Sequence, residues 1–249
     1  MWGIDHLERR RDVIWLRPIA FGVGILVLSA ALGETAAAGV VTVSSVLEAT
    51  KSAIAEQTGV QVVFDATSGL SSTSEKIVAD VGTTSGAETV SIGKAHLAAR
   101  LTPTEGYISG NSSGLTTIFG LSSPEAKKVG PDWVSWKAGT SQYSNLKSDL
   151  TISSITALLP RVKGTKLSTK ASGGVKLYVL KWTTAATGTT PKLAITLTIS
   201  ATGTILPVEA VSTAADGTKA TTKLSHWGGQ PLVSAPPIAS TIASSKVTG

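Results

Sequence analysis

The sequence predicts an α+β protein in which an antiparallel β half-barrel carries helices over its concave face and encloses an apolar cavity. Composition is the first reason: 42% of the 249 residues are hydrophobic but only 5% are aromatic, so small and β-branched residues that suit pleated sheets supply the core. The second is a long series of segments in which apolar and polar residues alternate between turns rich in Gly, Ser and Thr. Third, helical patterns are few and short.

Ten segments have the two-residue alternation of strands and are bounded by turn residues. They cover residues 60–68, 74–82, 88–103, 106–111, 131–137, 165–171, 175–182, 192–200, 205–212 and 218–227. In the segment that starts at residue 192, Leu193, Ile195 and Leu197 share one face, and alanine and threonine share the other. A sheet of such strands has one apolar face that must be covered. Strands that bend around helices in this way form a half-barrel with room for a cavity.

Three segments have helical patterns and supply that cover: 44–59, 112–130 and 148–162. In the first, Ser45 can cap the helix, Glu48 completes a capping box and Gly59 ends it. The second is expected to form two short helices, broken around Gly120 and the following Ser-Ser-Pro. The third can begin at Ser148 or Asp149, and Pro160 ends it.

The predicted apolar cavity takes its lining from both kinds of element. Apolar residues recur at helical spacing in the second and third helical segments and on one face of the strands. The predicted lining residues are Val62, Phe64, Leu97, Leu101, Leu115, Ile118, Phe119, Leu121, Ile152, Ile155, Leu158, Leu159, Leu193, Ile195 and Leu197.

The N-terminus has the layout of a secretory signal peptide. Basic residues precede an apolar run at 19–33, and three alanines then provide a cleavage site between Ala38 and Gly39. Residues 1–38 are therefore expected to be removed, leaving 39–249 as a single domain that is secreted or held in the cell envelope. The alternative is an uncleaved membrane anchor, for which the apolar run is short.

Charge and cysteine content exclude several classes of partner and chemistry. The chain has a net charge of +6, and residues 1–38 contribute four arginines and four acids, so their removal leaves this value unchanged. The lysines are scattered, without the concentrated basic stripe of a nucleic-acid-binding protein. Anionic lipid headgroups or cell-wall polymers are the better partners for this charge, and a surface that serves solubility alone is the equal alternative. With no cysteine in the chain, disulfides, thiolate metal sites and cysteine nucleophiles are excluded.

One motif points to catalysis. Residues 110–114 read Gly-Asn-Ser-Ser-Gly, which matches the G-x-S-x-G elbow of serine hydrolases, and Asp149 and His226 follow in an order that could complete a triad. That elbow belongs to a parallel sheet with alternating helices, whereas this chain has consecutive strands. We therefore expect Ser112 to be a turn or capping residue and the protein not to be an enzyme. Only His96 and His226 remain after cleavage, so neither a metal nor a cofactor is expected.

Three stretches resemble the actinobacterial LppX/LprG group of cell-envelope lipoproteins, whose fold is similar to that of the lipoprotein carrier LolA. They are "GYISGNSSGL", "PDWVSWK" and "LPVEAVSTAADGTKATTKLSHWGGQPLVSAPP", at 106–115, 131–137 and 206–237. The resemblance implies a half-barrel with helices in its mouth and an apolar cavity for the acyl chains of a lipid or glycolipid. The lipobox cysteine of the group is missing here, which excludes tethering by acylation.

The sequence thus favours an exported lipid or glycolipid carrier, expected to be monomeric and possibly served by an envelope membrane protein. A structural or interaction protein of the envelope with a filled core is the alternative. A secreted hydrolase using Ser112 is a third interpretation.

The signal peptide gives a first prediction. Intact-mass measurement of the exported protein should show a chain that begins at Gly39, because the apolar run is short and small residues follow it. Recovery of the full-length chain from the membrane would show that the segment is an anchor instead.

Overall fold

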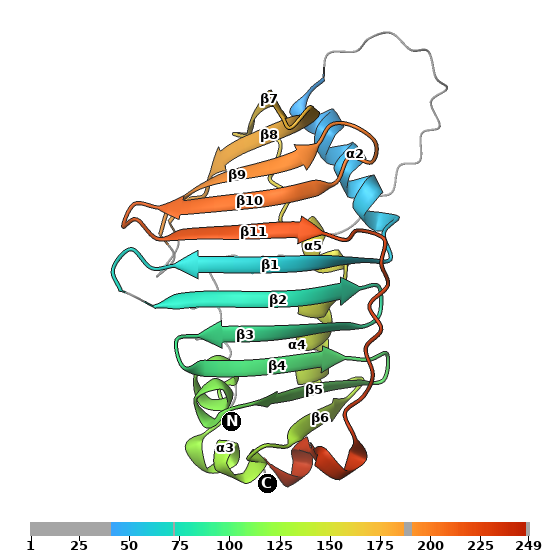
Figure 1. The fold of residues 1–249 in the computed structure, drawn as a ribbon, viewed down its shortest axis with the longest axis vertical. Helices are drawn as coiled ribbons and strands as arrows, with labels where there is room; N and C mark the ends of the chain where they lie inside the picture. The colour runs from blue at the N-terminus through green and yellow to red at the C-terminus, as the bar shows by residue number, and fades with distance from the viewer. Residues whose placement is uncertain (1–40, 72, 187–190, 248–249) are drawn as a thin grey trace.

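The computed structural model describes residues 41–71, 73–186 and 191–247, and its centre is one open sheet of twelve strands. The strands are ordered β12-β6-β5-β4-β3-β2-β1-β11-β10-β9-β8-β7 (Figure 1). Their bounds are β1 Gly59–Thr67, β2 Ser74–Gly82, β3 Gly86–Ile92, β4 Ala95–Leu101, β5 Glu105–Gly110, β6 Trp133–Lys137, β7 Lys166–Ser172, β8 Val175–Thr183, β9 Leu193–Ser200, β10 Pro207–Ala214, β11 Lys219–Ser225 and β12 Thr241–Ala243. The prediction of a mainly antiparallel sheet with few helices is confirmed.

Two meanders make up this sheet. Strands β1 to β6 follow one another antiparallel, β7 to β11 do the same, and pairing of β1 with β11 joins the two series. Only β12 runs parallel to its neighbour, β6. The helical elements are α2 Val43–Ala55, the π-helix η1 Gly114–Phe119, α3 Ser123–Val129, α4 Ser141–Leu150, α5 Ser153–Thr156 and two 3-10 turns, η2 Ile238–Ser240 and η3 Ser244–Lys246. None of the helices within these ranges has the length and hydropathy of a membrane span.

The two faces of the sheet differ because side chains alternate along each strand. Val62 of β1 is in register with Ala79 of β2 and Leu224 of β11, and the last two are buried. Ile54 of α2 and Ile155 of α5 pack in the same cluster as these residues. We call this side the helix-side face and the opposite side the outer face. Figure 1 shows α2, α4 and α5 behind the strands, on the helix side.

Helix α2 begins three residues earlier than the predicted cap implies. Thr42 is the N-cap and forms a capping box with Ser45, whose backbone N–H donates to Thr42 Oγ1 at 3.1 Å. The prediction that Ser45 and Glu48 form the box is therefore wrong, because Thr42 provides the same chemistry one turn earlier. The helix ends at Ala55, so that Gly59 begins β1 rather than ending α2.

Of the two later helical predictions, one is confirmed and one is wrong. The segment 112–130 forms η1 and α3 with a break at Gly120, whose φ of +88° requires glycine, and this split is confirmed. The single helix over 148–162 is wrong. Thr140 caps α4 at Ser141, and Thr151 is extended and bridges to Gly82 at the end of β2, so α5 is a separate short turn.

Twelve strands replace the predicted ten for two reasons. Gly93, with φ of +56°, allows a tight turn that divides 88–103 into the β3–β4 hairpin. The C-terminal segment, where no strand is predicted after residue 227, runs along the strand ends and adds β12 beside β6 (Figure 1). Val247 near its end is only 2% exposed.

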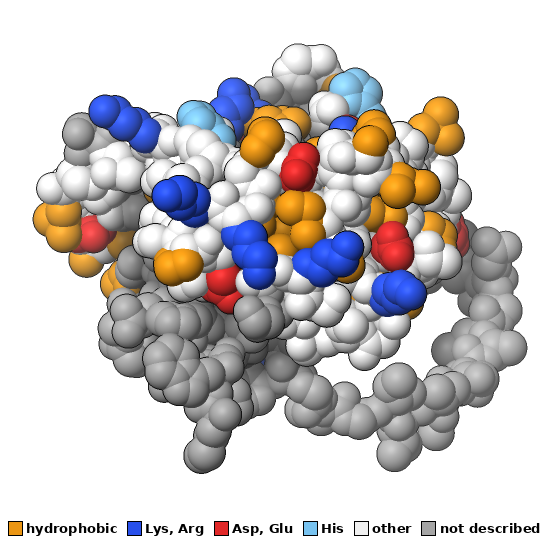
Figure 2. All heavy atoms as spheres, turned by 90° about the horizontal axis from the view of Figure 1, so that it is seen from below, with side chains coloured by type: hydrophobic (Ala, Val, Ile, Leu, Met, Phe, Trp, Pro, Cys, Tyr) orange, Lys and Arg blue, Asp and Glu red, His pale blue; other side chains and the backbone are white. Residues whose placement is uncertain are grey.

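Seen from the β6 end, the surface carries Lys and Arg interspersed with Asp and Glu (Figure 2).

Tyr107 of β5 gives a prediction about alkaline pH. Its hydroxyl donates to Glu105 Oε2 at 2.5 Å, and burial, with that bond to Glu105 adding to it, raises the pKa of Tyr107 from 10.0 to about 12. The neutral phenol therefore stabilises the fold fully below pH 10, and this contribution is lost as the pH rises from 10 to 12. The difference in phenolate absorbance between the wild type and Tyr107→Phe should titrate near pH 12. A difference curve centred at pH 10 would contradict this environment.

Candidate functional site

The Gly-Asn-Ser-Ser-Gly motif lies in a strand–turn–helix junction, between the end of β5 and η1. Asn111 organises the turn: its side-chain oxygen accepts from the backbone N–H of Gly114 at 2.7 Å and of His96 at 3.2 Å, and its amide donates to the Lys94 carbonyl at 2.8 Å. Ser112 itself is exposed. The turn is thus fixed by the asparagine and not by the serine.

Both glycines of the motif are explained by packing. A Cβ at Gly114 would lie 1.9 Å from the carbonyl oxygen of His96, and one at Gly110 would lie 2.4 Å from the same oxygen. Any side chain there would force the turn away from β4. The pattern of glycines that resembles a hydrolase elbow is therefore required by the close approach of two backbone segments.

The other proposed triad members lie elsewhere. Ser112 follows the end of β5, whereas His226 follows the end of β11, where Ser225 pairs with Gln61 near the start of β1. Because neighbouring strands from β1 to β5 are antiparallel, β1 and β5 run in the same direction. The first residues of both strands therefore lie on one side of the sheet, and the end of β5 lies on the opposite side. Asp149 is in α4, on the helix side. The structure does not bring Ser112 and His226 together.

The fifteen predicted lining residues fall into two groups by exposure. Nine are buried: Phe64, Leu97, Leu101, Leu115, Ile118, Ile155, Leu193, Ile195 and Leu197. Six are half-buried: Val62, Phe119, Leu121, Ile152, Leu158 and Leu159. The first group makes up packed core, and the second consists of large apolar side chains that remain partly exposed.

Four of the half-buried residues gather at one place. Val62 from the middle of the sheet and Ile152, Leu158 and Leu159 from the segment around α5 all pack against the buried cluster that contains Ile155. We call these five residues the α5 cluster. Leu159 also packs in the neighbouring cluster formed by α2 and strands β8 to β10, so the apolar surface continues toward that end of the sheet.

The segment around α5 has few described hydrogen bonds to the rest of the protein. Ile152 N–H donates to the Gly82 carbonyl at 2.8 Å, which ties the start of this segment to β2. Beyond it, the hydrogen bonds described for residues 153–165 all join residues within 151–165. Apolar contact therefore holds this cover against the sheet, and such contact exchanges readily for contact with an apolar ligand.

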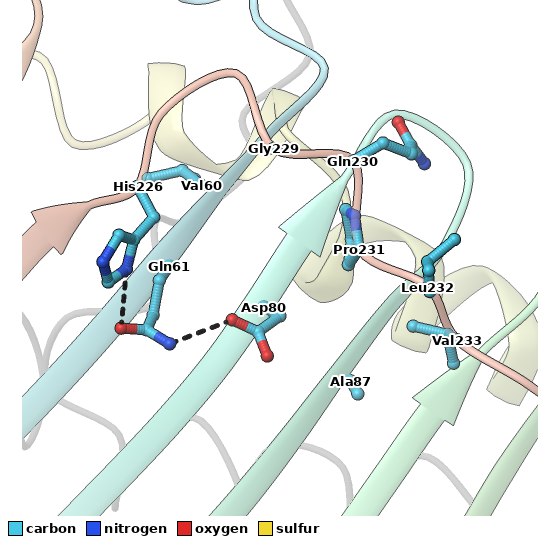
Figure 3. A pocket seen from close by; sticks show the side chains of 10 residues that line it. All are labelled: Val60, Gln61, Asp80, Ala87, His226, Gly229, Gln230, Pro231, Leu232 and Val233. Carbon is cyan, nitrogen blue, oxygen red and sulfur yellow. Dashed lines mark hydrogen bonds between the residues drawn. The ribbon is translucent and has the colours of Figure 1, made fainter.

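A pocket of about 330 Å³ lies on the outer face, between the strands and the C-terminal segment (Figure 3). Its lining residues are Val60, Gln61, Asp80, Ala87, His226, Gly229, Gln230, Pro231, Leu232 and Val233. None of the fifteen predicted residues is among them. No local sequence pattern indicates this pocket, because its walls come from strands and a segment that are far apart in the chain.

The polar groups of this pocket bond to one another. Gln61 donates to Asp80 Oδ1 at 3.2 Å, which turns its carbonyl oxygen toward His226 Nδ1 at 3.1 Å (Figure 3). The histidine therefore donates from Nδ1. His226 also has φ of +53°, the one positive value among the described residues other than glycine. This arrangement fixes the turn after β11 and contains no nucleophile. Among the described residues, no group of three or more His, Asp or Glu is placed to hold a metal ion.

Comparison with known proteins gives structural likenesses only. No protein-family model and no curated protein matches the chain. Similar solved structures include the lipoprotein LppX of Mycobacterium tuberculosis, at 15% identity and a TM-score of 0.47, covering 77% of this chain and 97% of that one. LprF of Mycobacterium bovis has 15% identity, a TM-score of 0.48 and coverage of 78% and 96%. MucB in complex with MucA has 14% identity, a TM-score of 0.35 and coverage of 78% and 59%. At these values the likenesses assign neither ligand nor activity.

The packing of the motif predicts effects of different size for two nearby substitutions. Gly114→Ala should lower the free energy of unfolding by about 1–3 kcal/mol, because the new methyl group displaces the backbone of β4. Ser112→Ala should change it by about 1 kcal/mol or less, since the side chain is exposed. Chemical denaturation measures both. Labelling of Ser112 by a fluorophosphonate probe, lost in Ser112→Ala, would restore the hydrolase interpretation.

Proposed function

We propose that the protein is an exported, non-enzymatic carrier that holds the acyl chains of a lipid or glycolipid between the helix-side face of its sheet and the segment around α5. In this proposal the sheet is the wall of a half-barrel and the α5 cluster is its mouth. The observation that supports it is that Val62 of the sheet and Ile152, Leu158 and Leu159 of the covering segment remain half-buried at one place, and that beyond Ile152 this segment makes only local hydrogen bonds.

The energetics suit an acyl ligand. Each methylene moved from water into apolar surroundings contributes about 0.8 kcal/mol, so a chain of ordinary length can displace the apolar contacts of the cover. Arg161 and Lys163 follow Leu158 and Leu159 closely in the chain, and both are exposed. Apolar side chains followed by cations match an amphiphile whose headgroup is anionic.

The rival function is a structural or interaction protein with a filled core, and one observation favours it. Nine of the fifteen predicted lining residues are buried in packed clusters, and Leu101, Leu115 and Leu197 are 0% exposed. A solid interior would leave only the outer face for partners. The two functions differ in whether the α5 cluster has volume to spare.

Native mass spectrometry of the protein purified from the cells that export it separates these functions. A carrier should retain a co-purified lipid, released on activation in the gas phase and identified by its mass. Recovery of the bare polypeptide mass alone, from both native and lipid-supplemented preparations, would favour the filled core.

A matched pair of substitutions locates the site. Leu158→Trp in the α5 cluster should be tolerated with a small loss of stability while lipid occupancy falls, because Leu158 is half-buried and the indole fills the space that the acyl chain uses. The control is Ile108→Trp: Ile108 is 0% exposed in the core cluster under α4, so tryptophan there should destabilise by about 1–3 kcal/mol or more. Melting curves and lipid extraction measure the two effects. Equal, severe destabilisation would show that the α5 cluster is solid.

A further inference from the structure

One long part of the chain has no acidic residue. Between Asp149 and Glu209 the sequence contains seven cations and no Asp or Glu. The cations are Arg161, Lys163, Lys166, Lys170, Lys176, Lys181 and Lys192, and all are exposed. The expectation of scattered lysines is therefore wrong for this region: the fold gathers them on and around β7 and β8 at one end of the sheet, whereas the β6 end mixes both signs (Figure 2).

Strand register sets these lysines apart from the others in the sheet. Three other lysines of the outer face lie opposite acids: Lys76 faces Asp65, Lys137 faces Glu105 and Lys223 faces Glu209. A fourth, Lys219, lies opposite Thr67 and Thr213. In the β7–β8 ladder, by contrast, Lys166 lies directly opposite Lys181.

Like charges directly opposite each other on a strand ladder destabilise the pairing. An arrangement that costs stability and recurs nowhere among these other lysine pairs points to a use outside the fold.

The outer face of this hairpin is also partly apolar. Lys166 and Lys170 of β7 share it with Lys181 of β8, and toward the tip it carries Val175, 43% exposed, and the half-buried Leu177. We call these five residues the β7–β8 basic surface. Strand β7 is the last strand of the sheet, so this surface stands at a free edge.

We propose that the β7–β8 basic surface binds the phosphate-bearing surface of an anionic lipid bilayer. A lysine near such a membrane contributes through attraction to the negative surface potential, and Val175 and Leu177 at the tip reach the boundary between headgroups and acyl chains. A bilayer provides both anionic phosphate and apolar contact, whereas a soluble polyanion provides only the first.

Chain connectivity supports the same orientation. Val43, at the start of α2, packs in one cluster with Leu167 of β7 and Tyr178 of β8. The apolar run at 19–33 is joined to residue 41 by only seven residues, which span at most about 25 Å. While that run is in or at a membrane, the β7–β8 end is therefore the part of the protein held close to it.

Vesicle co-sedimentation of the full chain tests the proposal, since the N-terminal residues then contribute equally in every variant. The test variant is Lys166→Gln/Lys170→Gln/Lys181→Gln, and the control is Lys76→Gln/Lys137→Gln/Lys223→Gln, which removes the same charge. Vesicles of phosphatidylglycerol and phosphatidylcholine are compared with pure phosphatidylcholine. The test variant should lose at least about tenfold in binding to the anionic vesicles, and the control should lose little. Neither should change on neutral vesicles.

Two outcomes would overturn the proposal. Equal loss in the two triple variants would mean that net charge alone drives binding. Wild-type binding that does not differ between anionic and neutral vesicles would leave a soluble acidic macromolecule as the partner of the surface. Val175→Ser separates these sources further: it should make vesicle binding more sensitive to salt, since apolar contact resists screening. The readout is independent of lipid occupancy in the α5 cluster, so either proposal can fail alone.

Discussion

The alternation of apolar and polar side chains along the strands is the constraint on which this structure depends. It gives the sheet one apolar face, and water must be excluded from that face if the fold is to be stable. Helices α2, α4 and α5 meet this requirement over parts of the face, with Ile54, Leu150 and Ile155 as buried contacts. The polar outer face then remains free for the C-terminal segment and for interactions with partners.

The helices that cover the apolar face are not packed equally tightly along the sheet. Under α4 the contacts are core contacts, with Leu146 and Leu150 at 2% and 0% exposure. Around α5, Val62, Leu158 and Leu159 remain half-buried, and the covering segment makes no sheet-like ladder with its surroundings. An element held mainly by apolar contact, with few hydrogen bonds to the rest of the fold, opens at a low free energy. A ligand of the same apolar character can therefore take the place of those contacts.

Local patterns were predicted well from the sequence, and long-range placement was not. Period-two alternation identifies the strands, and the break at Gly120 is visible because glycine alone accepts its backbone conformation. The end of α4 could not be predicted, because Thr151 leaves the helix to meet Gly82, a contact set by tertiary structure. For the candidate site, side-chain type indicated which residues face inward, but only packing separates the buried Leu197 from the half-buried Leu158. The absence of acidic residues from 150 to 208 is visible in the sequence, but only the register of β7 and β8 shows that lysines lie opposite each other there.

The central claim is that the segment around α5 covers an acyl-binding site, and photo-crosslinking tests it most directly. A fatty acid carrying a diazirine near the end of its chain would be incubated with the full-length protein, irradiated, and its attachment sites mapped by peptide mass spectrometry. Labels concentrated in residues 152–160 and in the part of β1 around Val62, and reduced by an excess of unlabelled fatty acid, are the predicted result. Labels confined to the outer face, or spread along the chain without competition, would contradict the account.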